Sequence, residues 1–145
     1  MDSVTISWLG VLLAAVAAFA LNMFWFSEKV FYTRWLAALG RPMPSREDAE
    51  GAGMGVAFGS VTAALFVQAF MVDWLLQAIT SLYDIRDLSL LGGLAAGAII
   101  GAGIAAATSL GHRVFAGQGF KVWAIEVGAD VIGLGLMGAV LSFWH

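Results

Sequence analysis

Glu126 and Asp130 are the two charged side chains in the otherwise apolar stretch 122–144. Their four-residue spacing would place both carboxylates on one face of a helix. A carboxylate at the bilayer centre costs roughly 2.5 to 3.5 kcal/mol on an insertion scale, so we expect the pair to face other helices or water. Because no Lys or Arg falls inside an apolar stretch to pair with them, four alternatives remain open. These are protonation of at least one acid, a bound cation, hydration from the cytoplasm, or hydrogen bonds from neutral groups on neighbouring helices.

Two neutral polar side chains, Asn22 and Thr108, are expected at a similar depth. One interpretation is a proton or cation site, with Glu126 and Asp130 as its titrating ligands and Asn22 and Thr108 as supporting groups. In the alternative, Asn22 and Thr108 form hydrogen bonds between helices and Glu126 reaches the nearby interface, which leaves only Asp130 to explain.

Other chemistry-bearing patterns are missing from the sequence. The chain has no Cys, which excludes disulfides, iron-sulfur ligation and thiol nucleophiles. It contains no serine nucleophile elbow and no H-E-x-x-H pair. We therefore predict that the protein is not an enzyme and has neither a metal nor a cofactor.

The composition requires a hydrophobic environment for these residues. Hydrophobic residues make up 61% of the 145 residues and charged residues 12%, and the mean hydropathy is +0.89. These values are far from those of a water-soluble domain. The net charge of -3 and the absence of a basic run indicate no nucleic-acid partner.

The apolar residues form four stretches, each long enough for a helix to cross a hydrocarbon core of about 30 Å. We predict a single domain, 1–145, that is an all-α integral membrane fold with four transmembrane helices in an antiparallel bundle. The predicted spans are residues 4–26, 51–74, 88–110 and 122–144.

Basic residues predict the orientation of these spans. Six of the seven Lys and Arg residues fall in the first and third connections. The positive-inside rule places those connections in the cytoplasm and both termini outside. The cytoplasmic aromatic belt would consist of Trp25, Trp35 and Trp123. In the first connection, an apolar residue recurs every fourth position, at Phe31, Trp35 and Leu39, which predicts an interfacial helix there.

This topology also predicts on which side of the membrane the remaining polar residues lie. Asp73, beside Trp74, is expected at the outer interface, where its carboxylate would reach water. His112 and His145 fall at opposite faces of the membrane and therefore cannot share one metal.

Small residues at four-residue spacing predict two helix-packing surfaces. They could mediate self-association, or they could pack spans two and three against each other, which is the interpretation we favour. The residues are Gly51, Gly55 and Gly59 on span two, and Gly93, Gly97 and Gly101 on span three. A G-x-G-x-x-G pattern at Gly133, Gly135 and Gly138 would lie inside the membrane rather than after a strand, so we assign it to helix packing instead of nucleotide binding.

Two further patterns resemble the small bacterial membrane proteins grouped as domain-of-unknown-function family seventeen-sixty-one. The first follows span one and comprises Trp25, Phe26, Ser27, Phe31, Trp35, Leu39 and Gly40. The second surrounds span four and comprises Phe115, Gly117, Ile125, Glu126, Gly128, Gly138, Ala139, Leu141 and Trp144. The chain departs from the family pattern at Glu28, Tyr32, Arg34 and Ala129. The resemblance covers nearly the whole chain and implies a four-helix membrane fold, with no activity and no functional residues to carry over.

These observations favour a non-catalytic accessory, assembly or stabilising element in the bacterial cytoplasmic (inner) membrane. Its partners would be the lipid bilayer and either further copies of itself or another membrane protein. The alternative is a proton- or cation-linked permeation protein that uses the acidic cluster. Such a protein would need a hydrated path from both faces, and residues 131–141 offer no polar side chain for one.

Overall fold

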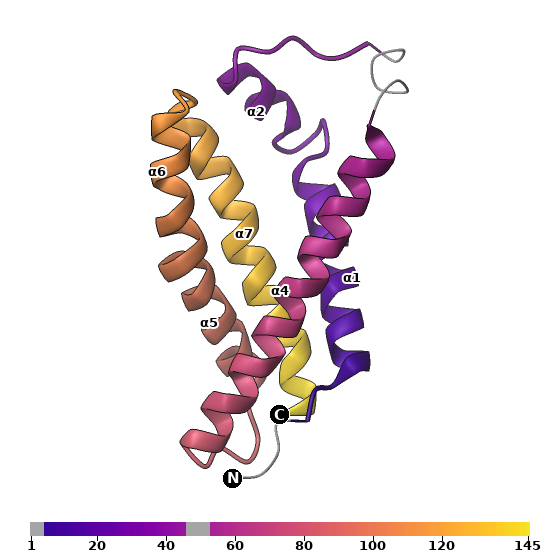
Figure 1. Ribbon diagram of the computed structural model, residues 1–145, viewed down its shortest axis with the longest axis vertical. Coiled ribbons are helices and arrows are strands. Elements are labelled where there is room, and N and C mark those ends of the chain that lie inside the picture. Colours follow the sequence, from indigo (N-terminus) through magenta and orange to yellow (C-terminus); the bar gives the residue numbers. More distant parts are fainter. Residues whose placement is uncertain (1–4, 46–52) are drawn as a thin grey trace.

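The computed structural model of the protein describes residues 5–45 and 53–145, and this part of the chain is helical without any strand. The elements, in chain order, are α1 (Trp8–Trp25), α2 (Tyr32–Ala38), α4 (Met54–Leu82), α5 (Leu90–Ile100), a π-helical turn (Gly101–Ala106), α6 (Ala107–Phe115), α7 (Gly119–Leu141) and a 3-10 turn (Ser142–Trp144). The π-helical turn joins α5 and α6 into one run (Figure 1).

Within the described residues, four helical segments are long and apolar enough to cross a membrane: α1, α4, the run Leu90–Phe115, and α7 with its 3-10 turn. They correspond to the four predicted spans. All four extend along the long axis of the molecule, and α2 lies beside one end of them (Figure 1). The structure is therefore that of a multi-pass membrane protein.

Two of these helices are longer than the sequence analysis predicts. α4 continues from the predicted limit at residue 74 to Leu82, and α6 continues from residue 110 to Phe115. A polar side chain marks where a segment can leave lipid, but it does not stop helical hydrogen bonding. α4 ends only where Asp84 adopts a left-handed conformation with φ of 51°. The starts of α1 and α5 are determined by the residues just before them. The Ser7 and Ser89 side chains cap these helices by accepting hydrogen bonds from the Gly10 and Gly92 N–H groups.

α7 forms the centre of the fold and contacts α1, α4 and α5. More than half of its apolar segment is buried, against about a quarter or less in the other three. The core beside it is made of closely packed aliphatic side chains: Val11, Ala14, Ala15, Ala18, Leu65, Ala69, Val72, Leu76, Leu134, Met137 and Leu141. This core occupies the half of the molecule that contains Ser7 and His145.

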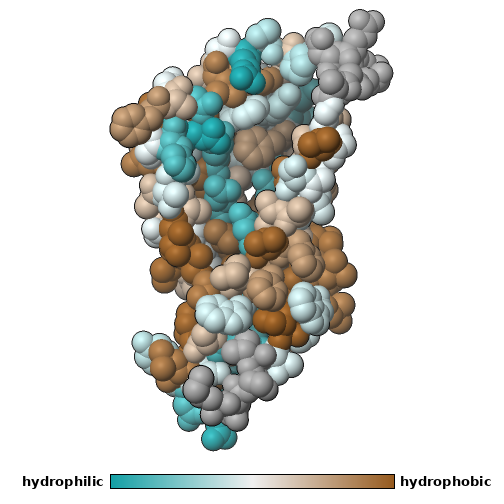
Figure 2. All heavy atoms as spheres, viewed as in Figure 1, coloured by the Kyte–Doolittle hydropathy of each residue, from teal (hydrophilic) through white to brown (hydrophobic). Residues whose placement is uncertain are grey.

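The other half of the molecule is more open. α4 runs obliquely, and its N-terminal half lies beside α1 and apart from α6 (Figure 1). Figure 2 shows a hollow in this region, where hydrophilic side chains gather within an otherwise hydrophobic surface. The face of α7 that carries the two acids belongs to this half.

Candidate functional site

Glu126 joins three helices through two polar contacts. Its Oε2 atom lies 2.6 Å from Arg113 Nε, and its Oε1 atom accepts a hydrogen bond of 3.0 Å from Trp35 Nε1. Arg113 is in the last turn of α6 and Trp35 is in α2. The expectation that no basic residue would pair with the acids is therefore wrong, because α6 extends far enough to bring Arg113 beside α7. Glu126 is largely shielded, with 17% of its side chain exposed.

Asp130 lies one turn further along the same face of α7, and its side chain is exposed. Within residues 5–45 and 53–145 its carboxylate makes no hydrogen bond and no ion pair, although the Arg113 and Glu126 charges act on it. Met137 continues this face at seven-residue spacing and is fully buried in the core. The face that is covered at Met137 is open at Asp130, because α4 has diverged there.

The two neutral residues predicted to support the acids are placed differently. Asn22 Nδ2 donates to the Ala18 carbonyl of its own helix at 3.0 Å. Thr108 is exposed on α6. In the part of the chain that the structure describes, neither side chain has a hydrogen bond to Glu126 or Asp130. What the structure brings together is Glu126, Arg113 and Trp35, with Asp130 beside them.

The tryptophans of the predicted cytoplasmic belt act as hydrogen-bond donors between helices. Trp25 Nε1 donates to the Ile125 carbonyl at 3.0 Å, and Trp123 Nε1 donates to the Ala106 carbonyl at 3.1 Å. Ala106 ends the π-helical turn, in which the regular helical bonding pattern is interrupted. The sequence analysis treats these indoles as interfacial anchors and predicts no hydrogen-bond acceptor for them. The acceptors are two backbone carbonyls and the Glu126 side chain, which lie far away in sequence.

The glycines of span three pack against α7 and not against span two. A Cβ at Gly93 would overlap the Gly138 carbonyl, and one at Gly97 would overlap the Leu134 carbonyl. A Cβ at Gly101 would lie 2.8 Å from Val131 Cα. The preferred prediction, that these glycines pack spans two and three together, is therefore corrected: the span-three glycines approach α7, whose own glycine pattern makes this close approach possible.

Two of the span-two glycines, Gly55 and Gly59, make no such approach to the residues that the structure describes. Nothing lies within 4 Å of a Cβ placed on Gly55 or Gly59, and Gly51 lies outside the described residues. Of the two small-residue patterns, the one on span three packs against α7, whereas the described part of the one on span two, Gly55 and Gly59, is open.

Asp73 forms a second polar site at the opposite end of the bundle. Its Oδ1 atom lies 2.8 Å from His145 Nε2, and its Oδ2 atom accepts a 3.2 Å bond from the Ser7 N–H. The Asp73 side chain is completely buried. The expectation that this carboxylate would be solvated is wrong, because α4 continues past it and the segments before α1 and after α7 close around it.

The sequence from residue 9 to residue 142 matches the family described as "Protein of unknown function (DUF1761)". The chain belongs to this family. No curated protein and no solved structure matches it.

The matched region of this DUF1761 chain contains Trp35, Arg113, Glu126 and Asp130, but the family description supplies no chemistry for them. The described residues contain no group of three His, Cys, Asp or Glu side chains that could hold a metal ion. The arrangement can therefore bind and orient by charge and hydrogen bonding. Its one carboxylate without a direct partner among the described residues is that of Asp130.

Proposed function

We propose that the protein is a non-catalytic assembly or stabilising element of the bacterial cytoplasmic membrane, and that the N-terminal half of α4 is the surface by which it associates. The observation that carries the proposal is the contrast between the two glycine patterns. Gly93 and Gly97 let α5 approach α7 until backbones touch, whereas Gly55 and Gly59 face open space. Small residues drive helix association in lipid because they allow such close approach.

Asp130 supports the same surface. An exposed carboxylate at membrane depth is costly unless water or a polar group covers it. Among the described residues, none makes a hydrogen bond or an ion pair with this carboxylate. A partner helix against α4, from a second copy or from another membrane protein, would border this carboxylate and leave it open to water from the cytoplasmic side.

The proposed topology is an antiparallel four-helix bundle with α2 at the cytoplasmic interface and both termini outside. The positive-inside distribution of Lys and Arg supports the orientation. Contacts of Asp73 with both Ser7 and His145 support termini on one side, because these residues come from opposite ends of the chain.

Site-specific photo-crosslinking tests the association surface. A photoreactive amino acid at Val56 lies one helical turn from Gly59, and Val56 is 76% exposed. A matched control position is Leu91 on α5, which is 73% exposed. We expect protein adducts in intact membranes from position 56, their loss on adding Gly59→Leu, and none from position 91. Lipid adducts alone at position 56 would overturn the proposal.

A second candidate, proton- or cation-linked permeation, is favoured by the shared face of Glu126 and Asp130 on α7. Against it stands the packed core between Asp130 and Asp73, where Val11, Val72 and Met137 are at most 2% exposed. A flux assay in proteoliposomes separates the two candidates. We expect no flux above empty liposomes. Flux that disappears in Asp130→Asn would replace the assembly proposal by permeation.

A further inference from the structure

The face of the α5–α6 run that packs against α7 shifts by one residue at the π-helical turn. Gly93, Gly97 and Gly101 are buried at every fourth position. The next buried residue is Ala106, five positions later, and Arg113 follows after seven more. A π-helical turn bonds residues five apart instead of four, so it holds one extra residue. The contact face therefore continues one residue later than in an unbroken α-helix.

This shift decides which side chain of α6 faces Glu126. In an unbroken α-helix, eleven residues make about three full turns, so His112 would lie within about 20° of the direction of Gly101. Arg113, one residue later, would point about 120° away from that direction. With the extra residue of the turn, Arg113 takes the facing position, and its Nε atom lies 2.6 Å from Glu126 Oε2. His112 is exposed.

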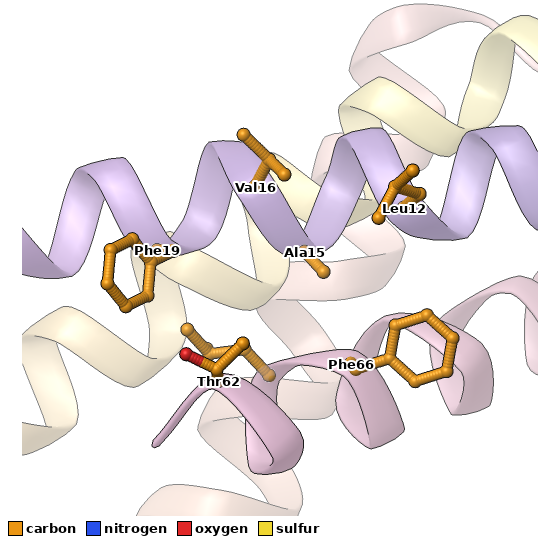
Figure 3. Close-up of a pocket in the computed structure, with 7 residues that line it drawn as sticks. Leu12, Ala15, Val16, Phe19, Thr62 and Phe66 are labelled. Carbon is orange, nitrogen blue, oxygen red and sulfur yellow. The ribbon is translucent and has the colours of Figure 1, made fainter. Parts of the chain in front are cut away.

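Neighbouring helices do not provide another means of orienting α6. α5 is fixed against α7, because α7 backbone atoms lie where a Cβ at Gly93 or Gly97 would be. α6 packs against α7, whereas the N-terminal half of α4 packs against α1, where Phe19 and Thr62 line an apolar cavity of about 220 Å³ (Figure 3). The direction of α6 side chains therefore depends on the turn that connects α6 to α5.

A hydrogen bond from α7 holds the end of this turn. Trp123 Nε1 donates to the Ala106 carbonyl at 3.1 Å, and Trp123 lies about one helical turn before Glu126 on α7. Beyond α5, α7 thus makes polar contacts with the run both at the last residue of the π-helical turn and at Arg113. A rotation of α6 by about 100°, the angle of one residue, would take Arg113 away from Glu126.

We propose that the π-helical turn is a register joint of the candidate site, which turns α6 so that Arg113, instead of His112, faces Glu126. The joint positions the basic side chain that pairs with an acid of α7 among the described residues. Without the extra residue in the turn, Glu126 would face His112, and Arg113 would point away from α7. The joint belongs to α5 and α6 and is separate from the association surface on α4.

Cross-linking of engineered cysteine pairs tests the register, because the chain has no native Cys. The reagent is a bifunctional thiol cross-linker about as long as the two side chains that it replaces, and mass spectrometry of the intact chain detects the product. In isolated membranes, Arg113→Cys with Glu126→Cys should be linked severalfold faster than His112→Cys with Glu126→Cys. Both pairs lack the ion pair, so the preference reports the backbone register alone. Equal rates, or a preference for position 112, would overturn the proposal.

Variants that change the length of the turn provide the second test. Deletion of Gly103, a position with open surroundings, should convert the turn to α-helix and keep the cross-link from position 113. An alanine inserted after Gly103 should rotate α6 by about 100° and reduce that cross-link severalfold. Loss of the cross-link in the deletion variant, or its survival in the insertion variant, would contradict the role of the turn.

A disulfide between α5 and α7 is the folding control for the length variants. A Cβ at Gly135 would lie 3.5 Å from Ala98 Cβ, which is within the usual range for a disulfide. Ala98→Cys with Gly135→Cys should therefore be oxidised equally at all three lengths, because Ala98 precedes the turn. If a length variant fails this control, the comparison of positions 112 and 113 in the chain of native length decides alone.

Discussion

His145 Nε2 lies 2.8 Å from Asp73 Oδ1, with 3% of the histidine side chain and none of the aspartate side chain exposed. The same carboxylate accepts the Ser7 N–H, and Gln77, one turn further along α4, exchanges hydrogen bonds with the Thr5 backbone. These contacts connect α4 to the segments that precede α1 and follow α7. They close the end of the bundle that lies opposite the hollow.

Removing His145 should destabilise the protein strongly. His145→Ala leaves a buried carboxylate with the Ser7 N–H as its one donor among the described residues, and loss of one partner from a buried pair costs roughly 3–5 kcal/mol. The free energy of unfolding in mild detergent checks this. Asp87→Asn, at an exposed position of the connection before α5, is the control and should have no measurable effect.

A double-mutant cycle with Asp73→Ala identifies the source of the loss. If the pair itself is responsible, the double variant should be less destabilised than the sum of the single variants. Additive effects would mean that each side chain contributes only through its own packing.

The sequence sufficed to predict the four apolar helices, because twenty-odd residues with at most two charges have few alternatives in a chain of this composition. It could not predict the partner of Asp73, since that depends on how far α4 continues and on where residues 66 and 72 positions away in sequence fold back. The pairing of Arg113 with Glu126 was missed for a similar reason, because a charged residue at the end of an apolar stretch can remain in the helix.

The glycines illustrate the same limit. Their spacing predicts surfaces for close approach, but spacing alone does not state which helix approaches. Gly93 and Gly97 approach α7 because α7 has glycines at the facing positions, Gly138 and Gly135. The sequence analysis treats those α7 glycines as a separate pattern. Comparing the glycine spacing of span three with that of span four would have predicted that these two spans pack together.

Gly97→Ala should destabilise the α5–α7 contact. The added Cβ would overlap the Leu134 carbonyl and stand 3.0 Å from Gly135 Cα, and backbone atoms cannot rotate away as a side chain does. We expect a loss of about 1–3 kcal/mol in the free energy of unfolding. Gly103→Ala, where nothing lies within 4 Å, should instead leave stability unchanged or raise it, because Ala favours a helix. Equal effects of the two changes would contradict the packing described above.

Trp35→Phe should loosen α2. The change removes the hydrogen bond to Glu126 Oε1, worth about 1 kcal/mol, and retains most of the ring contact. Amide hydrogen exchange should therefore accelerate about fivefold in residues 32–38. Trp123→Phe is the matched control, since it removes an indole donor that binds Ala106 instead of Glu126. Faster exchange of α2 in both variants would show a general loss of packing.

Labelling of single cysteines tests whether water reaches position 130, and the absence of native Cys leaves no background reaction from the chain itself. A membrane-impermeant maleimide requires a hydrated thiolate, so Asp130→Cys should react. Met137→Cys, on the same α7 face but fully buried, and Ile104→Cys, 63% exposed on the apolar outer surface, should not. The proposed topology predicts that Asp130→Cys reacts in inverted vesicles and is protected in intact cells. Reaction from the outside would reverse the orientation, and no reaction from either side would mean that Asp130 is covered by a partner or by lipid.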